Sequence, residues 1–303
     1  MPEAIVYLNG EFVPASRAKL NIFDFGVILG ATLTEMTRTF AHRPFRLEDH
    51  AARLLRSCKY AGIGIGMTQD DLVEATQAVI SHNVARLKPE EDLAAVHVVT
   101  PGESWMYAGI GDTKRPPSPT ICIHTFPLPF HAWSHYYREG AHLIIPATRH
   151  VPPECVDPKT KNRSRLHWFL AEQQARLGDP QAIPLLLDLS GNLTECAGAN
   201  FVIVRDGVIL SPTSRNILQG VSLATVRELA PAAGLEFEER DLQVYDAVNS
   251  GEAWMCSTPY CIAPVTRING ASIGDGRPGP ACRRMLAAWG ELVGVDIQRQ
   301  LLG

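Results

Sequence analysis

The sequence predicts an α+β protein of two domains, a smaller one at the N-terminus and a larger one at the C-terminus. The chain has 303 residues, of which 46% are hydrophobic and 20% charged, so it can fill two separate cores. Segments with the period of strands alternate with segments of helical period, and we find no internal repeat. One segment, 126–136, fits neither pattern and is the expected linker. The expected domains are therefore residues 1–125 and 137–303.

The expected first domain begins with apolar residues on both sides of Asn9-Gly10, a pair typical of tight hairpin turns. Thr68 and Asp71 form a capping-box signature, which marks the start of a helix containing residues 72–80. The spacing of apolar residues predicts the remaining elements. These are strands at 34–40, 93–99 and 120–126, and a helix at 49–61.

The linker segment is rich in proline and aromatic residues. Its prolines cannot continue a strand, and its aromatic residues have no helical period. Beyond it, Asp206-Gly207 and Asn269-Gly270 are typical two-residue hairpin turns. The other elements expected in the second domain are strands at 141–145, 182–189, 200–205 and 208–210, and helices at 164–177, 221–233 and 280–292.

Composition excludes several classes of function. A formal net charge of −4 and a pI near 6.2 give no basic field for nucleic acid. No stretch approaches the roughly 18 apolar residues of a membrane helix, and no leader pattern is found, so a cytoplasmic enzyme is expected. The seven cysteines are scattered, without a CxxC pair. We expect them to be reduced and mostly buried, with no metal site.

Two segments carry residues that could belong to one site for a phosphate and a pyridine ring. Lys161 lies in a turn, 157–162, just before a predicted helix, where rigid neighbours could direct its amine into a cleft. A solvated basic loop is the alternative, since exposed lysines are common in loops. Glu195 lies among small residues between two predicted strands, where a carboxylate needs a cationic partner such as a protonated pyridine nitrogen. An exposed turn glutamate is the alternative here.

Two further segments suit an anion, although each is a weak signal alone. Gly220 precedes a predicted helix whose first amides could point at a phosphate, and Ser222 adds a hydroxyl. A simple turn glycine is the alternative. Thr258, with Ser257 before it, closes a predicted strand where Pro259 ends the ladder pairing.

Together these segments resemble a known family. Lys161, Glu195, Gly220-Val221-Ser222 and Thr258 occur in the order and at nearly the spacing of the fold-type IV pyridoxal-phosphate enzymes, the class IV aminotransferases. The resemblance covers almost the whole chain, including first-domain signatures at 30–38 and 45–54. The family comprises branched-chain aminotransferases, D-amino-acid aminotransferases, (R)-amine transaminases and aminodeoxychorismate lyases.

The resemblance implies pyridoxal 5'-phosphate as cofactor and a role for each matching residue. Lys161 would bind the cofactor aldehyde covalently and later move a proton, with Lys159 as the nearby rival. Glu195 would keep the ring nitrogen protonated, so that the ring draws electrons. Arg53 would pair with the phosphate in a charge-assisted contact. The amides and hydroxyls around that phosphate would come from Gly220, Val221, Ser222 and Thr258.

The resemblance also implies an activity. Glu35 occupies the place where the aminotransferases of the family carry glutamate and its lyases carry threonine. We therefore expect a ping-pong transfer of an amino group from a branched-chain or other hydrophobic amino acid, or an amine, to a 2-oxo acid. A D-amino-acid or (R)-amine transaminase, an aminodeoxychorismate-lyase-like enzyme and a non-catalytic cofactor-binding protein are the alternatives. The family implies a homodimer or higher homo-oligomer.

Substrate recognition departs from the family. The carboxylate-binding arginine of D-amino-acid and (R)-amine enzymes is replaced in the segment 100–102, and the branched-chain arginine is replaced by Val96 or His97. The family's ring-hydroxyl tyrosine is replaced by Arg165 or Leu166. Without these groups the enzyme is expected to be permissive, accepting leucine and amines that lack a carboxylate. The candidate substrate residues are Arg38 and Arg115, which could bind a carboxylate, with Leu29, Thr34 and Pro259.

Overall fold

The computed structural model describes residues 3–109 and 118–302 and divides the chain into two compact units. The first unit contains Met1–Leu128 and Thr160–Ser164, and the second contains Pro129–Lys159 and Arg165–Gly303. The boundary between the two units at Leu128 and Pro129 falls inside the segment 126–136, which was expected as the linker. The return of residues 160–164 to the first unit was not predicted, because it depends on pairing between segments far apart in the sequence.

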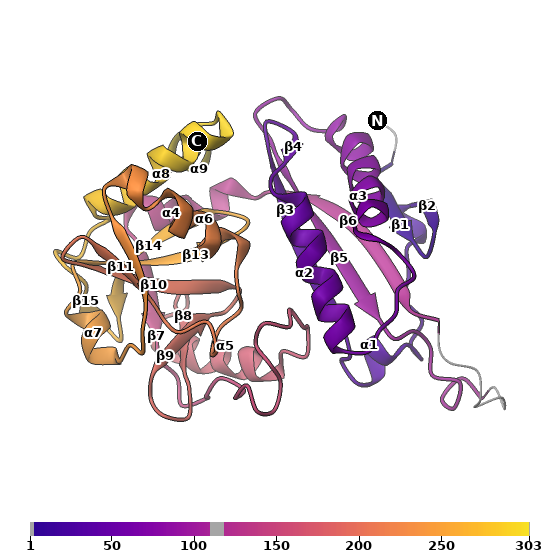
Figure 1. Ribbon diagram of the computed structural model, residues 1–303, viewed down its shortest axis with the longest axis horizontal. Coiled ribbons are helices and arrows are strands. Elements are labelled where there is room, and N and C mark those ends of the chain that lie inside the picture. The colour runs from indigo at the N-terminus through magenta and orange to yellow at the C-terminus, as the bar shows by residue number, and fades with distance from the viewer. Residues whose placement is uncertain (1–2, 110–117, 303) are drawn as a thin grey trace. The chain divides into compact units, whose positions relative to one another are not determined.

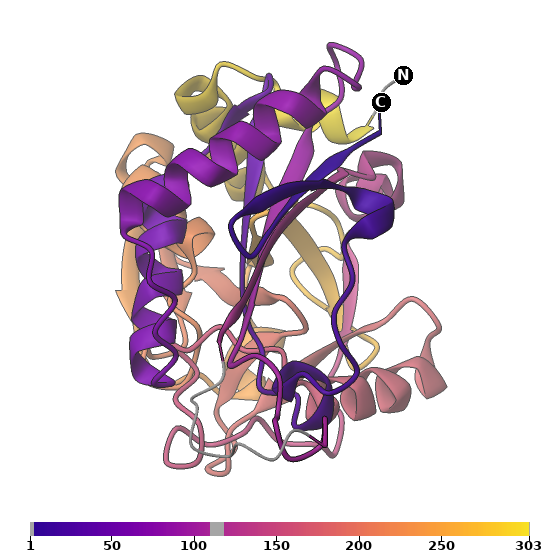
Figure 2. The ribbon, with the colours of Figure 1, turned by 90° about the vertical axis from the view of Figure 1, so that its right-hand side faces the viewer.

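The first unit is an antiparallel sheet covered on one face by two helices. Its strands follow the order β2-β1-β6-β5-β3-β4. Helices α2 (Leu47–Tyr60) and α3 (Gln69–Val84) lie on the same face of the sheet (Figure 1, Figure 2). The strands are β1 (Ile5–Leu8), β2 (Glu11–Pro14), β3 (Leu33–Phe40), β4 (Arg43–Pro44), β5 (Leu93–Thr100) and β6 (Thr120–Pro127). The short helices η1 (Ala15–Arg17) and α1 (Phe25–Ile28) lie between β2 and β3.

Apolar packing and local signals explain this unit. Leu33, Leu54, Leu72 and Val99 are buried together between the sheet and the helices. The capping box predicted at the start of α3 is present, because the Thr68 side chain accepts from the Asp71 amide and the Asp71 side chain accepts from the Thr68 amide. The Asn9-Gly10 turn is also confirmed, with φ of 53° and 97° at its two residues.

The second unit is built around a closed ring of strands. Its strands follow the order β12-β11-β10-β13-β14-β7-β8-β9, and β15 pairs with β14. Since β9 also pairs with β10, the strands from β10 to β9 close into a barrel. The strands are β7 (Ala141–Ile144), β8 (Ile183–Leu187), β9 (Leu193–Cys196), β10 (Ala199–Arg205), β11 (Val208–Ser211), β12 (Glu236–Glu239), β13 (Glu252–Ser257), β14 (Cys261–Ile268) and β15 (Ala271–Ser272).

Helices surround this barrel. Helix α5 (Leu166–Gly178) packs against β8, and α8 (Pro280–Val293) packs against β13 and β14 (Figure 1). The other helices of this unit are α4 (Phe130–Arg138), α6 (Val221–Leu229), η2 (Pro231–Ala233), α7 (Val244–Val248) and α9 (Ile297–Leu302). Both predicted hairpin turns are confirmed, with φ values of 52° and 81° at Asp206-Gly207 and of 49° and 81° at Asn269-Gly270. In the described part of the chain, no helix has the length and apolar character that crossing a membrane requires.

Two expectations about individual elements were wrong. The segment 126–136 is not irregular: β6 includes Pro127, and α4 begins just after Pro129. Pro127 and Pro129 lie at positions where the missing amide hydrogen interrupts no hydrogen bond between strands. Helix α4 is held by Tyr137, whose hydroxyl donates to the carbonyl of Tyr260 at 2.6 Å. The helix expected at 221–233 ends at Leu229, because Pro231 cannot continue it and a short 3₁₀ turn follows.

A buried histidine makes the first unit sensitive to acid. His97 of β5 is fully buried, and its Nε2 lies 2.7 Å from Oγ1 of Thr76, which donates to the Leu72 carbonyl. His97 therefore donates from Nε2 and stays neutral. Burial lowers the pKa of His97 from 6.5 to about 4. The unfolded chain binds this proton more readily, so the stability present above pH 6.5 is lost as pH falls toward 4.

We therefore predict that lowering the pH from 7 to 5 reduces the free energy of unfolding by about 2 kcal/mol through His97 alone. Urea titrations at both pH values measure it. In His97→Gln, which keeps a donor for Thr76 but does not titrate, the loss should be smaller by that amount. An equal loss in both proteins would show that other groups cause the acid sensitivity.

Candidate active site

Lys161 is held by its backbone along the edge of β3 in the first unit. Its carbonyl accepts from the Thr34 amide at 2.9 Å, and its own amide donates to Oγ of Ser57 at 3.4 Å. The residue is half-buried. Lys159 differs, because it is exposed and its Nζ lies 3.1 Å from Oδ2 of Asp157. Of the two candidate lysines, Lys161 therefore has the more fixed position.

A buried charge cluster of β3 and α2 surrounds Arg53. Nε and Nη2 of Arg53 donate to the two carboxylate oxygens of Glu35 at 2.8 and 2.6 Å, and Nδ1 of His50 lies 2.9 Å from Glu35 Oε1. Burial opposes ionisation of Glu35, but Arg53 and His50 outweigh it and hold the pKa of that carboxyl well below its usual range. Glu35 thus remains an anion that fixes the plane of the Arg53 guanidinium.

We predict that Arg53→Ala lowers the free energy of unfolding by about 3–5 kcal/mol, because it leaves the Glu35 carboxylate buried without its cation. Chemical denaturation measures this loss. In a double-mutant cycle with Glu35→Gln, the double variant should lose clearly less than the sum of the single losses. Strict additivity would show that the two residues do not stabilise each other.

Glu195 lies on β9 in the second unit, where its carboxylate has three hydrogen-bond partners among the described residues. Oε2 accepts from the Leu218 amide at 3.0 Å and from Nδ2 of Asn200 at 3.2 Å, and Oε1 lies 3.4 Å from Nε2 of His150. The side chain is only 14% exposed. The carboxylate therefore presents fixed acceptor atoms of the kind that a protonated ring nitrogen requires.

The N-terminus of α6 lies beside the same residues. Gly220 is its N-cap and offers no side-chain cap, no acidic residue occupies the first turn, and Val221 and Ser222 are buried. A Cβ at Gly220 would lie 2.1 Å from Oδ1 of Asn200, so only glycine fits. Asn200 also donates to the Leu218 carbonyl at 2.8 Å. This one amide side chain thus joins the Glu195 carboxylate to the segment that leads into α6.

The C-terminal end of β13 lies close to the turn between β9 and β10. Oγ of Ser257 donates at 2.7 Å to the carbonyl of Gly198, which lies in the turn between β9 and β10. Thr258 and Pro259 follow in the turn that leads to β14, and both are half-buried. The structure therefore brings the Thr258 segment near the turn that follows β9, the strand that carries Glu195.

These residues of the second unit fit pyridoxal 5'-phosphate. The Glu195 carboxylate matches a protonated pyridine nitrogen, and the amide-rich start of α6 matches a phosphate. Glycine at position 220 leaves room for the Asn200 side chain that donates to Glu195. The sequence had indicated Glu195 and Gly220, but it assigned no role to Asn200. It gave no signal for His150.

The candidate substrate residues lie in different environments. Arg38 is buried: Nη2 lies 3.7 Å from Oδ2 of Asp92, Nε donates to the Thr39 carbonyl, and the guanidinium lies over the Phe40 ring. These contacts give Arg38 a structural role in the first unit, and its binding of a carboxylate stays a prediction. Arg115 lies outside the described residues.

The two other first-unit candidates also differ in exposure. Thr34 is buried and its hydroxyl donates to the His97 carbonyl, whereas Leu29, the C-cap of α1, is 66% exposed. Leu29 is therefore the more accessible of the two, and the substrate role of both stays a prediction.

The fold and the site define the class of the protein. A model of the family "Amino-transferase class IV" matches residues 32–268, so the chain belongs to the class IV aminotransferases, and it is a transaminase. A Methanocaldococcus jannaschii protein, assigned provisionally as a branched-chain-amino-acid aminotransferase, is 29% identical over 286 residues, which are 92% of this chain and 93% of that protein.

Two solved structures are also similar. The branched-chain amino acid aminotransferase of Escherichia coli is 26% identical, with a TM-score of 0.86 over 96% of this chain and 95% of that chain. The T.th. branched-chain amino acid aminotransferase with pyridoxamine 5'-phosphate is 24% identical, with a TM-score of 0.85 over 97% of this chain and 95% of that chain. The predicted family and the fold-type IV, α+β architecture are confirmed.

Proposed function

We propose that this class IV aminotransferase uses pyridoxal 5'-phosphate to move an amino group from a branched-chain or other hydrophobic amino acid to a 2-oxo acid. The observation that carries the cofactor assignment is the Glu195 carboxylate, fixed by Asn200 and Leu218 next to the uncapped start of α6. Relatives named as branched-chain aminotransferases, and a solved neighbour holding pyridoxamine 5'-phosphate, support it.

When bound, the cofactor supplies an aldehyde and an electron-withdrawing ring. Lys161 would bind that aldehyde through Nζ, and its free amine would move a proton at the reacting carbon. Glu195 would hold a proton on the ring nitrogen. The amides of Val221 and Ser222, with the Thr258 hydroxyl, would bind the phosphate. Arg53, oriented by Glu35, would add a charge-assisted contact to the phosphate.

The amino donor is tested by a screen that compares L-leucine, D-amino acids and simple amines, each with 2-oxoglutarate or pyruvate as acceptor. Because neither family carboxylate arginine is present in or after β5, we predict turnover of L-leucine and measurable turnover of amines without a carboxylate. Strict dependence on an α-carboxylate would contradict this reading. Variants of Arg38 and Arg115 would then show which residue binds it.

The same screen separates the other activities. Turnover of D-amino acids or (R)-amines alone would favour those transaminases, and elimination without an acceptor would favour a lyase. Cofactor binding without turnover would favour a non-catalytic protein. The homodimeric state stays a prediction, which light scattering tests. The cytoplasmic location also stays a prediction.

A further inference from the structure

His150 is held by the backbone on one side and faces the Glu195 carboxylate on the other. It lies in the loop between β7 and α5 and is 8% exposed. Its amide donates to the Leu187 carbonyl at 2.9 Å, which ties the loop to the barrel. Its Nδ1 lies 2.9 Å from the Val151 carbonyl, and its Nε2 lies 3.4 Å from Oε1 of Glu195. The ring therefore bridges a carbonyl and a carboxylate.

The chemistry of these two partners determines the protons on the ring. A carbonyl oxygen can only accept, so Nδ1 must carry a hydrogen to bond to Val151. An ionised carboxylate can only accept as well, so Nε2 must carry a hydrogen to bond to Glu195. The ring that satisfies both contacts is the imidazolium. His150 is thus placed as a cation beside the buried Glu195 carboxylate.

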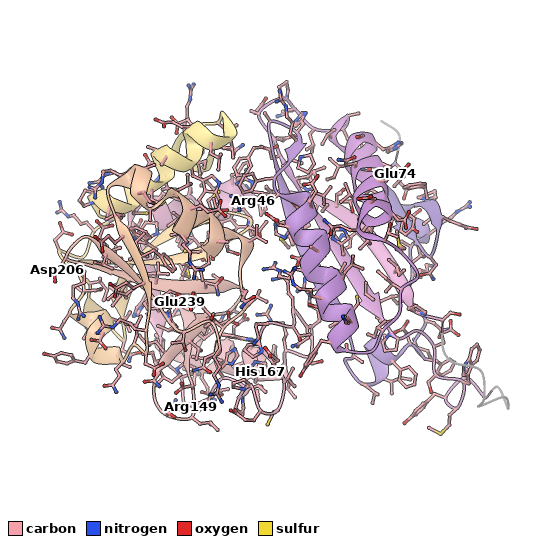
Figure 3. All side chains as sticks on the ribbon, viewed as in Figure 1. Arg46, Glu74, Arg149, His167, Asp206 and Glu239 are labelled. Carbon is pink, nitrogen blue, oxygen red and sulfur yellow. The ribbon has the colours of Figure 1, made fainter. Side chains whose placement is uncertain are left out.

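The aromatic residues of α5 hold this ring in place. Trp168 and His167 make edge contacts with His150, with ring centroids 5.8 and 6.0 Å apart, and the Arg165 guanidinium lies 5.5 Å over Trp168. Figure 3 shows His167 at the start of α5 and Arg149 in the loop that precedes this helix. The Arg149 guanidinium donates to backbone carbonyls instead of the carboxylate.

The charges that face the pair favour this assignment. Burial, followed by His150 and Arg165, lowers the pKa of His167 to about 4, so His167 is neutral near pH 7. Glu195 is the carboxylate that faces these groups. His167 therefore adds no charge beside Glu195, and His150 is the histidine whose Nε2 lies 3.4 Å from Oε1 of that carboxylate.

We propose that His150 is a positioning residue that donates from Nε2 to Oε1 of Glu195 and so keeps the carboxylate oriented toward a ring nitrogen. A carboxylate has about four acceptor positions. Leu218, Asn200 and His150 occupy three of them in the described part of the chain, which leaves one for the ring N–H. The inference rests on the proposed cofactor and adds the group that orients its glutamate.

A pair of ligands tests the proposal. Pyridoxal 5'-phosphate has the ring nitrogen, and its 1-deaza analogue has a C–H group at that position. In His150→Phe, which keeps a ring but no donor, we expect the Kd of pyridoxal 5'-phosphate to rise about tenfold or more, as for a lost hydrogen bond to a charged group. The Kd of the deaza analogue should stay nearly unchanged. His150→Gln, whose amide can donate near the Nε2 position, should restore part of the difference.

A matched control removes a similar contact elsewhere in the second unit. Nδ1 of His142 lies 2.8 Å from Oδ2 of Asp179, and His142→Phe should leave the ratio of the two dissociation constants unchanged. Thermal unfolding of each variant checks that it is folded. If His150→Phe weakens both ligands equally, or neither, then His150 does not act through Glu195 and the proposal is overturned.

A second measurement does not depend on the cofactor. In the cofactor-free protein at neutral pH, the ¹⁵N chemical shifts of the His150 ring should show both nitrogens protonated. A neutral ring with hydrogen on Nδ1 alone would place a lone pair against the carboxylate and overturn the proposal. Failure of the unmodified protein to bind pyridoxal 5'-phosphate would instead remove the proposed function, while the ¹⁵N result would still decide the state of His150.

Discussion

Lys161→Ala is expected to abolish turnover, whereas Lys159→Ala is expected to retain most of it. Lys161 is half-buried with its backbone fixed by Thr34 and Ser57, and we expect its amine to serve for covalent attachment and for proton transfer. Lys159 is exposed and ion-paired with Asp157, an arrangement that contributes little at a surface. Steady-state assays of the two variants measure the difference.

Chemical labelling gives an independent check. Borohydride reduces a bond between a lysine amine and an aldehyde to a stable linkage, so peptide mapping should find the cofactor on Lys161. Label on Lys159, or on no lysine, would remove the assignment. Equal losses of activity in the two variants would indicate a damaged loop instead of a lost catalytic amine.

Glu195→Gln is expected to retain the cofactor, with a raised Kd, but to slow the first half-reaction strongly. The glutamine amide still fills the space and can bond to Leu218, but it cannot hold a proton on a ring nitrogen. Stopped-flow absorbance with excess amino donor measures the half-reaction. Glu172 of α5 provides the control, because it is half-buried and pairs with Arg176 in the same helix, and Glu172→Gln should leave the rate unchanged.

The size of the effect decides whether Glu195 has this role. A rate that falls by less than about tenfold corresponds to less than about 1.4 kcal/mol of barrier and would argue against it. A complete loss of cofactor from Glu195→Gln would also contradict the expectation, because the start of α6 and Gly220 remain intact in that variant.

Much of the fold was predictable because local signals suffice for it. The Asn-Gly and Asp-Gly turns require positive φ at both residues, and the structure has them at Asn9-Gly10 and Asp206-Gly207. The capping box at Thr68 satisfies amides within one turn of helix. Prediction failed where packing overrode local preference, as in α4, whose aromatic residues pack on Tyr260.

The sequence by itself determined the family and the order of the candidate site segments. The spacing from Lys161 to Glu195, Gly220 and Thr258 can be measured directly in the sequence. Only the tertiary structure decided which charges meet. Arg38 with Asp92, and His150 with Glu195, are 54 and 45 residues apart. Such pairs form when strands and loops close a barrel or a sheet, and a buried charge then takes the partner that the fold brings to it.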